Sequence, residues 1–176
     1  RELVGRDDLT SDDVPRQLLL ANERILEAVS ARPEQKGMGT TATGIVLVAA
    51  GGSDHWAVFN VGDSRVYLRP VGSPVLQQLT VDHSAVQMLV DAGELTPAEA
   101  RVHPRRNVIT RALGSREALT VDVAEIPLAS GDLVLLCSDG LYQDLDHDLL
   151  TAALLRPVLR TLEKLAQVQP QGTGEA

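Results

Sequence analysis

The first regular pattern of apolar and polar positions along the chain is helical. The polar stretch Thr10-Ser11-Asp12-Asp13 supplies N-cap candidates, and Pro15 is tolerated in a first helical turn. Apolar residues then recur at the spacing of one helix face, at Leu18, Ala21, Ile25, Leu26 and Val29. The sequence therefore predicts a helix from about residue 14 to residue 31.

Beyond residue 41 the pattern changes to short β-branched runs that are separated by turn residues. Glycine-rich segments divide these runs, which predicts three strands joined by tight turns, at 44–48, 56–61 and 65–68. A shorter strand over 75–79 follows. Two helices are then expected, over about 85–92 and 97–102, because Pro97 stands where a helix start tolerates proline.

The last third of the chain begins with two further strands. Residues 119–126 alternate between apolar and polar, and residues 132–137 are almost continuously apolar, which predicts a half-exposed strand followed by a fully buried one. Helices are expected over about 146–155 and 157–168, and the polar tail 169–176 is expected to be disordered. This order of elements suits a single α+β domain over residues 1–168 with antiparallel strands.

Composition narrows the class of protein. The 176 residues are 44% apolar and 2% aromatic, and 24 acidic against 16 basic side chains give a net charge of −8. This balance repels phosphate backbones and anionic membranes, so neither nucleic acid nor a membrane is an expected partner. A single cysteine, Cys137, allows no intrachain disulfide, and the sequence has no run that is typical of a signal peptide or a membrane span. We expect a soluble protein of the cytoplasm.

Two turns place an aspartate directly after an apolar strand. Asp63 lies in Gly62-Asp63-Ser64-Arg65, and Asp139 lies in Ser138-Asp139-Gly140. Mg²⁺ and Mn²⁺ prefer carboxylate oxygens, and aspartates at the ends of separate strands can converge on one ion. The same dipeptides are also ordinary hairpin turns, so the pattern leaves a metal site and a structural turn both open.

Other hydrolase chemistries find no support. The residue six positions after Cys137 is Gln143 rather than the arginine of a cysteine phosphatase, and the four histidines form no His-x-x-x-His pair. Neither a Gly-rich phosphate loop with Lys nor a Gly-x-Ser-x-Gly elbow occurs. The basic cluster His103-Pro104-Arg105-Arg106-Asn107 could hold a phosphopeptide through its guanidinium groups, or it could be solvated loop charge.

Five short motifs, taken together, resemble the consecutive motifs of bacterial PPM (type 2C) metal-dependent serine/threonine protein phosphatases. The resemblance covers about residues 14 to 150 and rests on Gly37-Met38-Gly39-Thr40-Thr41, Val61-Gly62-Asp63-Ser64-Arg65-Val66-Tyr67, Leu79-Thr80-Val81-Asp82-His83-Ser84, Asn107-Val108-Ile109-Thr110-Arg111-Ala112-Leu113-Gly114 and Leu136-Cys137-Ser138-Asp139-Gly140-Leu141. It implies the family's α-β-β-α sandwich, with two antiparallel sheets face to face and helices outside. The motif residues expected to shape its turns are Gly37, Gly39, Thr40, Thr41, Gly62, Ser64, Ser138 and Gly140.

The resemblance also implies the family's chemistry, in which Mg²⁺ or Mn²⁺ ions activate a water that attacks the phosphorus of phosphoserine or phosphothreonine. Asp139 then resembles a core metal ligand, and Asp63 resembles the ligand of a more weakly held third ion. The segment from His83 to Asn107 resembles the flap beside the substrate cleft. Its candidate substrate residues are His83, Ser84, Arg105, Arg106 and Asn107. Phosphoproteins, among them a serine/threonine kinase, are the implied partners.

Two segments of the family pattern have no counterpart in the chain. One is the family's opening portion, with an arginine that holds the substrate phosphate and an Asp-Gly-Met-Gly-Gly turn, and the other is a Gly-x-x-Asp-Asn motif near the end. Lys36-Gly37-Met38-Gly39 is not that turn, because it has Lys in place of Asp and the following Thr40-Thr41 identifies it as the separate motif that starts the next strand. We therefore expect a sandwich incomplete at both ends, weak metal binding, slow turnover or none, and self-association through uncovered sheet edges. Three alternatives stay open: a shortened phosphatase, a pseudophosphatase that binds phosphoproteins or a kinase without hydrolysis, and an unrelated domain with similar turns.

Overall fold

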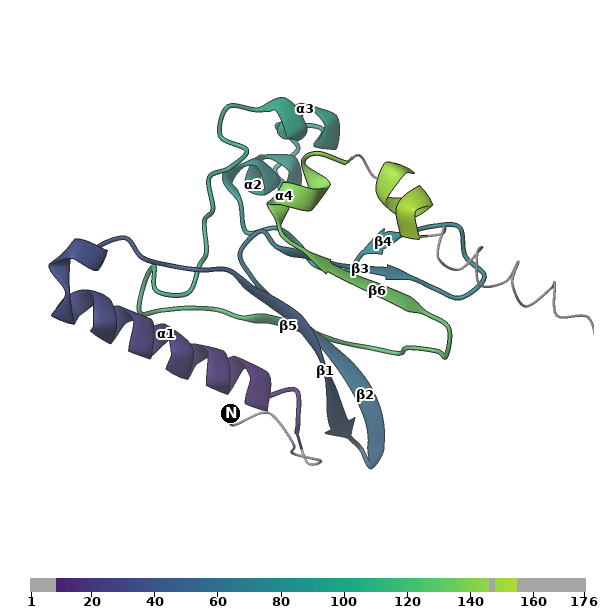
Figure 1. The fold of residues 1–176 in the computed structure, drawn as a ribbon, viewed down its shortest axis with the longest axis horizontal. Coiled ribbons are helices and arrows are strands. Elements are labelled where there is room, and N and C mark those ends of the chain that lie inside the picture. The colour runs from purple at the N-terminus through teal and green to yellow at the C-terminus, as the bar shows by residue number, and fades with distance from the viewer. Residues whose placement is uncertain (1–8, 146–147, 155–176) are drawn as a thin grey trace, which may run out of the picture.

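The computed structural model describes residues 9–145 and 148–154, which build two three-stranded antiparallel sheets with helices outside them (Figure 1). The first sheet has the strand order β1-β2-β5, and the second has the order β4-β3-β6. This arrangement confirms the predicted α+β architecture. The strands are β1 (Ala42–Ala50), β2 (Ser53–Val61), β3 (Arg65–Arg69), β4 (Gln77–Gln78), β5 (Asp122–Ile126) and β6 (Leu133–Cys137). The helices are α1 (Asp13–Ala31), the 3₁₀ turn η1 (Pro33–Gln35), α2 (Ala85–Asp91), α3 (Pro97–Val102) and α4 (Asp139–Tyr142).

Helix α1 lies along the first sheet (Figure 1) and is fixed to a distant loop by one buried side chain. Asn22 is 1% exposed; its Nδ2 donates to the Arg116 carbonyl (3.0 Å), and its Oδ1 accepts from the Gly114 N–H (2.7 Å). A buried amide is costly unless both of its ends are bonded, so this pair holds the helix in one position. The helix begins at Asp13, close to the predicted start, and the Asp13 carboxylate accepts from the Thr10 N–H (3.0 Å).

Strands β1 and β2 form a hairpin around Gly51 and Gly52, whose φ angles are 59° and 84°. Glycine adopts such left-handed angles at little cost, which explains the tight turn at this point. The hairpin buries Val48 and Ala57 against Leu9. Strand β5 pairs antiparallel with the other edge of β2, from Asn60 opposite Asp122 to Trp56 opposite Ile126, so the first sheet joins segments that are distant in the chain.

Strand β6 is less buried than its apolar run predicts. None of its residues is fully buried, and Leu136 is 43% exposed. In the described part of the chain β6 pairs with β3 alone, so it is an outer strand of its sheet. The prediction of a fully buried strand is therefore wrong for the described residues, because a continuous apolar run does not specify how many layers cover it.

The boundaries of some other helices and strands differ from the predicted ones for local reasons. Strand β4 has two residues rather than the predicted 75–79, since the Val75 N–H bonds to the Ser73 Oγ (3.1 Å) instead of to a neighbouring strand. The two predicted helices at the flap are confirmed as α2 and α3. Helix α4 was not predicted, and it begins at the Asp139 that the sequence analysis placed in a turn.

Part of the predicted C-terminal structure cannot be compared. Residues 148–154 are helical, in agreement with the helix expected over 146–155. The helix expected over 157–168 and the tail 169–176 lie outside the described residues. Among the helices that the structure describes, none combines the length and the apolar character needed to cross a bilayer.

Candidate functional site

The two acidic turns meet at one end of the second sheet. Strands β3 and β6 pair antiparallel with Arg65 opposite Cys137, so Asp63, just before β3, and Asp139, just after β6, emerge at the same end. The Tyr142 hydroxyl, from α4, donates to the Asp63 carbonyl (2.8 Å) and ties the helix to the turn. The two carboxylates that the sequence singles out therefore come from separate strands and lie close together.

The electrostatics of this end favour a cation. Burial raises the pKa of Asp63, and the negative charges of Asp139 and Asp82 raise it further, against the opposing effects of a backbone hydrogen bond and of Arg65. A carboxylate that is 6% exposed and repelled by two others holds its charge at a cost in free energy. A bound cation would remove that cost.

One guanidinium beside the turn is already bonded to internal partners. Arg65 donates to both carboxylate oxygens of Asp82 (2.8 and 2.6 Å) and to the Tyr67 hydroxyl (2.9 Å), and it stacks 3.6 Å from the centroid of the Tyr142 ring. Burial works to lower the pKa of Arg65, but the hydrogen bond and the charge of Asp82 raise it above its ordinary value. Arg65 and Asp82 thus neutralise each other, and the excess negative charge belongs to Asp63 and Asp139.

The imidazole of His83 is hydrogen-bonded to the turn that carries Asp63. The Gly62 N–H donates to its Nδ1 (2.9 Å), so Nδ1 carries no proton, and Nε2 bonds to the Asp122 Oδ2 (2.9 Å). A neutral ring must then carry its proton on Nε2 and donate it to Asp122. Asp122 also accepts from Arg111 (2.5 Å); burial works to raise the pKa of Asp122, but the bonds to His83 and Arg111 lower it.

The residues expected to face substrate divide into two groups. His83 and Ser84 are 6% and 2% exposed and have internal partners; Ser84 caps α2 by accepting from the Gln87 N–H (3.2 Å). They hold the segment in place rather than facing solvent. Arg105, Arg106 and Asn107 are exposed. In addition, the Gln143 Nε2 donates to the Asn107 Oδ1 (3.2 Å) and also to the Asp139 Oδ2 (3.3 Å).

The glycines and threonines of the motifs shape the turn that carries Asp63. Gly62 has a φ of 112°, and a Cβ at this position would clash with the Thr41 side chain. The Thr41 Oγ1 lies 2.9 Å from the Ser64 Oγ. Thr40 and Leu113 exchange two backbone hydrogen bonds (3.1 and 2.9 Å), and a Cβ on Gly39 would lie 2.9 Å from the Leu113 carbonyl oxygen. These motif residues therefore pack the strand start against the acidic turn.

The remaining motif residues have simpler surroundings. Ser138 is the N-cap of α4 without a side-chain cap bond, Gly140 lies in the first turn of this helix, and Gly37 has a φ of 89° with open space around it. Tyr142, Gln143, Asp82 and Asp122 were missed by the sequence analysis as parts of the site. Asp82 stands in a quoted motif and could have been singled out, but nothing local marks the other three.

The carboxylates at this site are ligands of the kind that a hard cation prefers, but they are too few to replace most of its water shell. Asp63 and Asp139 offer the carboxylate oxygens that Mg²⁺ and Mn²⁺ prefer. Within residues 9–145 and 148–154, however, no group of three or more His, Cys, Asp or Glu side chains is arranged to hold a metal ion. Two carboxylates leave most of the water shell of Mg²⁺ in place.

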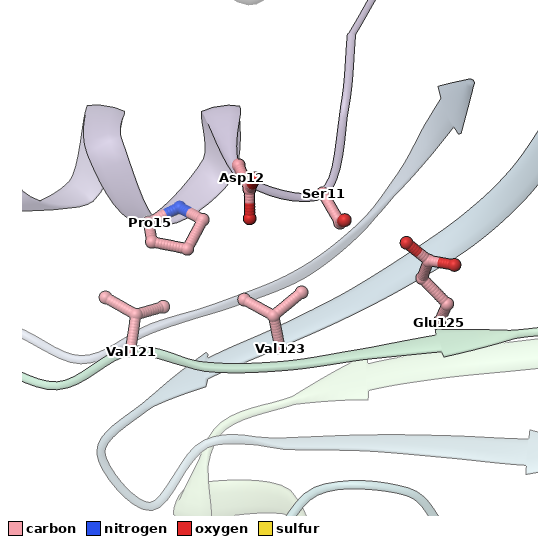
Figure 2. A pocket seen from close by; sticks show the side chains of 6 residues that line it. All are labelled: Ser11, Asp12, Pro15, Val121, Val123 and Glu125. Carbon is pink, nitrogen blue, oxygen red and sulfur yellow. The ribbon is translucent and has the colours of Figure 1, made fainter. Parts of the chain in front are cut away.

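A hollow lies between the start of α1 and β5, apart from this site. Figure 2 shows its six lining residues, which include the carboxylates of Asp12 and Glu125 and the side chains of Val121 and Val123. Its volume is about 280 Å³. None of its lining residues belongs to the acidic turns, so we assign no function to it.

Comparison with known proteins identifies the family. The model of the family described as protein phosphatase 2C matches residues 2–171. The chain belongs to this family. The resemblance to type 2C phosphatases is therefore confirmed, and the reading as an unrelated domain with similar turns is wrong.

Several bacterial members of the protein phosphatase 2C family are similar in sequence. The serine/threonine phosphatase stp of Listeria monocytogenes is 39% identical over 120 residues, which cover 68% of this chain and 45% of that protein. The serine/threonine protein phosphatase PstP of Mycobacterium tuberculosis is 38% identical over 157 residues, which cover 87% of this chain and 29% of that protein. The chain thus spans less than half the length of these relatives.

Solved structures of the family share the fold. The serine/threonine phosphatase of S. agalactiae has a TM-score of 0.71 and 30% identity, and the match covers 92% of this chain and 59% of that one. The catalytic domain of PstP, solved in complex with two manganese ions, has a TM-score of 0.68 and 36% identity, and the match covers 85% of this chain and 59% of that one. The two-sheet architecture is therefore that of the family.

Proposed function

We propose that this chain is part of a cytoplasmic, metal-dependent phosphatase that removes phosphate from phosphoserine and phosphothreonine in proteins, a serine/threonine kinase among them. The observation that carries the proposal is the convergence of Asp63 and Asp139 at one end of the β3–β6 pair, with negative charge that the neighbouring residues do not neutralise. The family supports the chemistry, since the PstP catalytic domain was solved with two manganese ions.

In this proposal Asp139 and Asp63 hold Mg²⁺ or Mn²⁺, which would supply a polarised water and neutralise charge on the phosphoryl group. The other residues act on the two aspartates. Arg65 fixes Asp82 and stacks on Tyr142, and Tyr142 in turn donates to the Asp63 carbonyl. These contacts limit the positions that the Asp63 carboxylate can take, which lowers the entropy that ion binding would cost.

A second candidate is a pseudophosphatase that binds phosphoproteins or a kinase without hydrolysis. It is favoured by the small donor set, because no group of three or more His, Cys, Asp or Glu side chains in the described residues is arranged to hold a metal ion, and Mg²⁺ needs several fixed oxygens. For this reason we expect the chain on its own to bind metal weakly and to turn over slowly.

Hydrolysis of p-nitrophenyl phosphate against Mn²⁺ concentration tests the proposal. We compare the chain with Asp139→Asn, which removes one ligand charge, and with Asp54→Asn, which removes an exposed charge on β2. A slow Mn²⁺-dependent rate that falls at least about tenfold in the Asp139 variant and is unchanged in the Asp54 variant is expected. Equal rates in all three proteins would contradict the assignment.

Binding separates the two candidates. A phosphothreonine peptide that binds the chain with and without Mn²⁺ but is never hydrolysed would favour the pseudophosphatase. Sedimentation of the same samples tests the proposed self-association, which is supported by the outer positions of β1 and β6 in the described sheets and by Leu47 and Leu136, 45% and 43% exposed. A monomer at all concentrations would contradict it.

A further inference from the structure

A groove of about 590 Å³ runs beside the acidic turns, between the flap helices α2 and α3 on one side and α4 on the other. Figure 1 shows these three helices gathered on the side of the molecule away from α1. The apolar part of the lining comes from Val86, Val90, Pro97 and Ala100 and from Leu145 and Leu149 in the C-terminal part. The groove can therefore accept an apolar side chain of a bound segment.

The groove is continuous with the acidic site. Tyr142 and Gln143 both line it, and the same two residues contact the site directly, through the Tyr142 hydroxyl on the Asp63 carbonyl and the Gln143 amide on the Asp139 carboxylate. A polypeptide with a phosphorylated residue at Asp63 and Asp139 would thus place its neighbouring residues in the groove.

The charge around the groove is opposite to that of the whole protein. Three arginines, Arg65, Arg101 and Arg106, line the groove against the two aspartates Asp82 and Asp144, although the whole chain has a net charge of −8. Arg101 and Arg106 line the groove, both are exposed, and neither forms an ion pair with a carboxylate of the described residues. Arg105 is also exposed, but it does not line the groove. Of the two adjacent arginines, only Arg106 therefore lies where it can contact a bound segment.

We propose that this groove binds an acidic segment of the substrate protein, next to the phosphorylated residue, with an apolar side chain against Val86 and Val90 and carboxylates at Arg101 and Arg106. The proposal rests on the proposed function and adds a substrate class to it. Guanidinium groups that lack internal partners pair with carboxylates or with a second phosphate. The groove lining also includes two acidic residues, but these do not repel a bound acidic segment at the apolar residues. Asp82 is neutralised by Arg65, and Asp144 lies at the α4 side of the groove.

Fluorescence polarisation with three labelled peptides tests the groove without requiring turnover. The first peptide carries phosphothreonine followed by leucine and glutamates, the second has lysines in place of the glutamates, and the third is the first without phosphate. We expect the first to bind at least about tenfold more tightly than the second at low salt. Arg106→Glu should weaken the first peptide about tenfold and leave the second unchanged or tighter, and Arg105→Glu should change either by less than about twofold.

The outcomes below would contradict the proposal. If Arg105→Glu weakens binding as much as Arg106→Glu, general charge rather than the groove is responsible. If the glutamate and lysine peptides bind alike, the groove does not select acidic segments. Arg101→Glu repeats the test should Arg106→Glu fail to fold, as judged by its thermal melt. Self-association of the chain that Arg106→Glu abolishes would instead assign the groove to a second copy.

The groove and the proposed function fail in distinguishable ways. If only the phosphatase assignment is wrong, the acidic peptide still binds more tightly than the basic one and still responds to Arg106, but its phosphate is never released at any Mn²⁺ concentration. If only the groove is wrong, phosphate is released with Mn²⁺ from the acidic and basic peptides at equal rates, and Arg106→Glu leaves both rates unchanged.

Discussion

The buried imidazole of His83 allows a sharp test of how the Asp63 turn is held in place. His83 is 6% exposed and joins two partners of different kinds. Its Nδ1 accepts from the buried Gly62 N–H, and its Nε2 donates to Asp122, whose side chain is 48% exposed, at 2.9 Å in both cases. The two bonds can be removed separately, because asparagine and glutamine each reproduce one of the two ring nitrogens.

His83→Asn places an amide oxygen near the position of Nδ1 and keeps the acceptor for Gly62. His83→Gln places an amide nitrogen near Nε2 and keeps the donor for Asp122. Loss of the buried acceptor leaves the Gly62 N–H without a partner, which costs about 1–3 kcal/mol. Loss of the half-exposed contact with Asp122 costs about 0.2–1 kcal/mol. We therefore expect the glutamine variant to be the less stable of the two by about 1–2 kcal/mol.

Urea unfolding measures this difference, provided that the m-values of the two variants agree. The amide proton shift of Gly62 in a ¹⁵N-labelled sample should stay near its wild-type value in His83→Asn and move in His83→Gln. Asparagine also leaves the larger cavity, which works against the expected order. An asparagine variant that is equal or lower in stability, and in which the Gly62 amide shift moves as far as it does in His83→Gln, would refute the view that the bond from Gly62 to Nδ1 is the important one.

The other two predictions concern the turn itself. Burial, with repulsion from Asp139, raises the pKa of Asp63 above 3.8, so its charge opposes folding as pH rises through the raised pKa. Asp63→Asn should then raise the free energy of unfolding at pH 7 by about 0.5–2 kcal/mol in metal-free buffer, with no gain near about pH 3. Thermal melts at both pH values measure this. A variant that melts at a lower temperature than the wild type at pH 7 would contradict the prediction. Gly62→Ala, at a φ of 112° and against Thr41, should cost more than about 2 kcal/mol, whereas Gly51→Ala, at a φ of 59° with open space, should cost about 1 kcal/mol. Equal losses in urea unfolding would show that the Gly62 turn relaxes.

The sequence alone determined the parts of this protein that depend on local patterns. Apart from α4 and the length of β4, the strand and helix positions followed from apolar periodicity and from glycine turns, because side chains alternate or repeat with the period of the element they belong to. Asp63 and Asp139 could be singled out for the same reason, since each follows an apolar run and stands beside small residues. The metal-binding role that the motif pattern suggests for them remains a prediction.

Only the tertiary structure decided which of these residues act together. The pairing of Arg65 with Asp82 and of His83 with Asp122 joins residues 17 and 39 positions apart, and no local pattern specifies a partner at that distance. Arg105 and Arg106 are equivalent in the sequence, yet only Arg106 lines the groove. Such choices depend on sheet register and on which surfaces pack, which are set by the free energy of the whole fold rather than by any short segment.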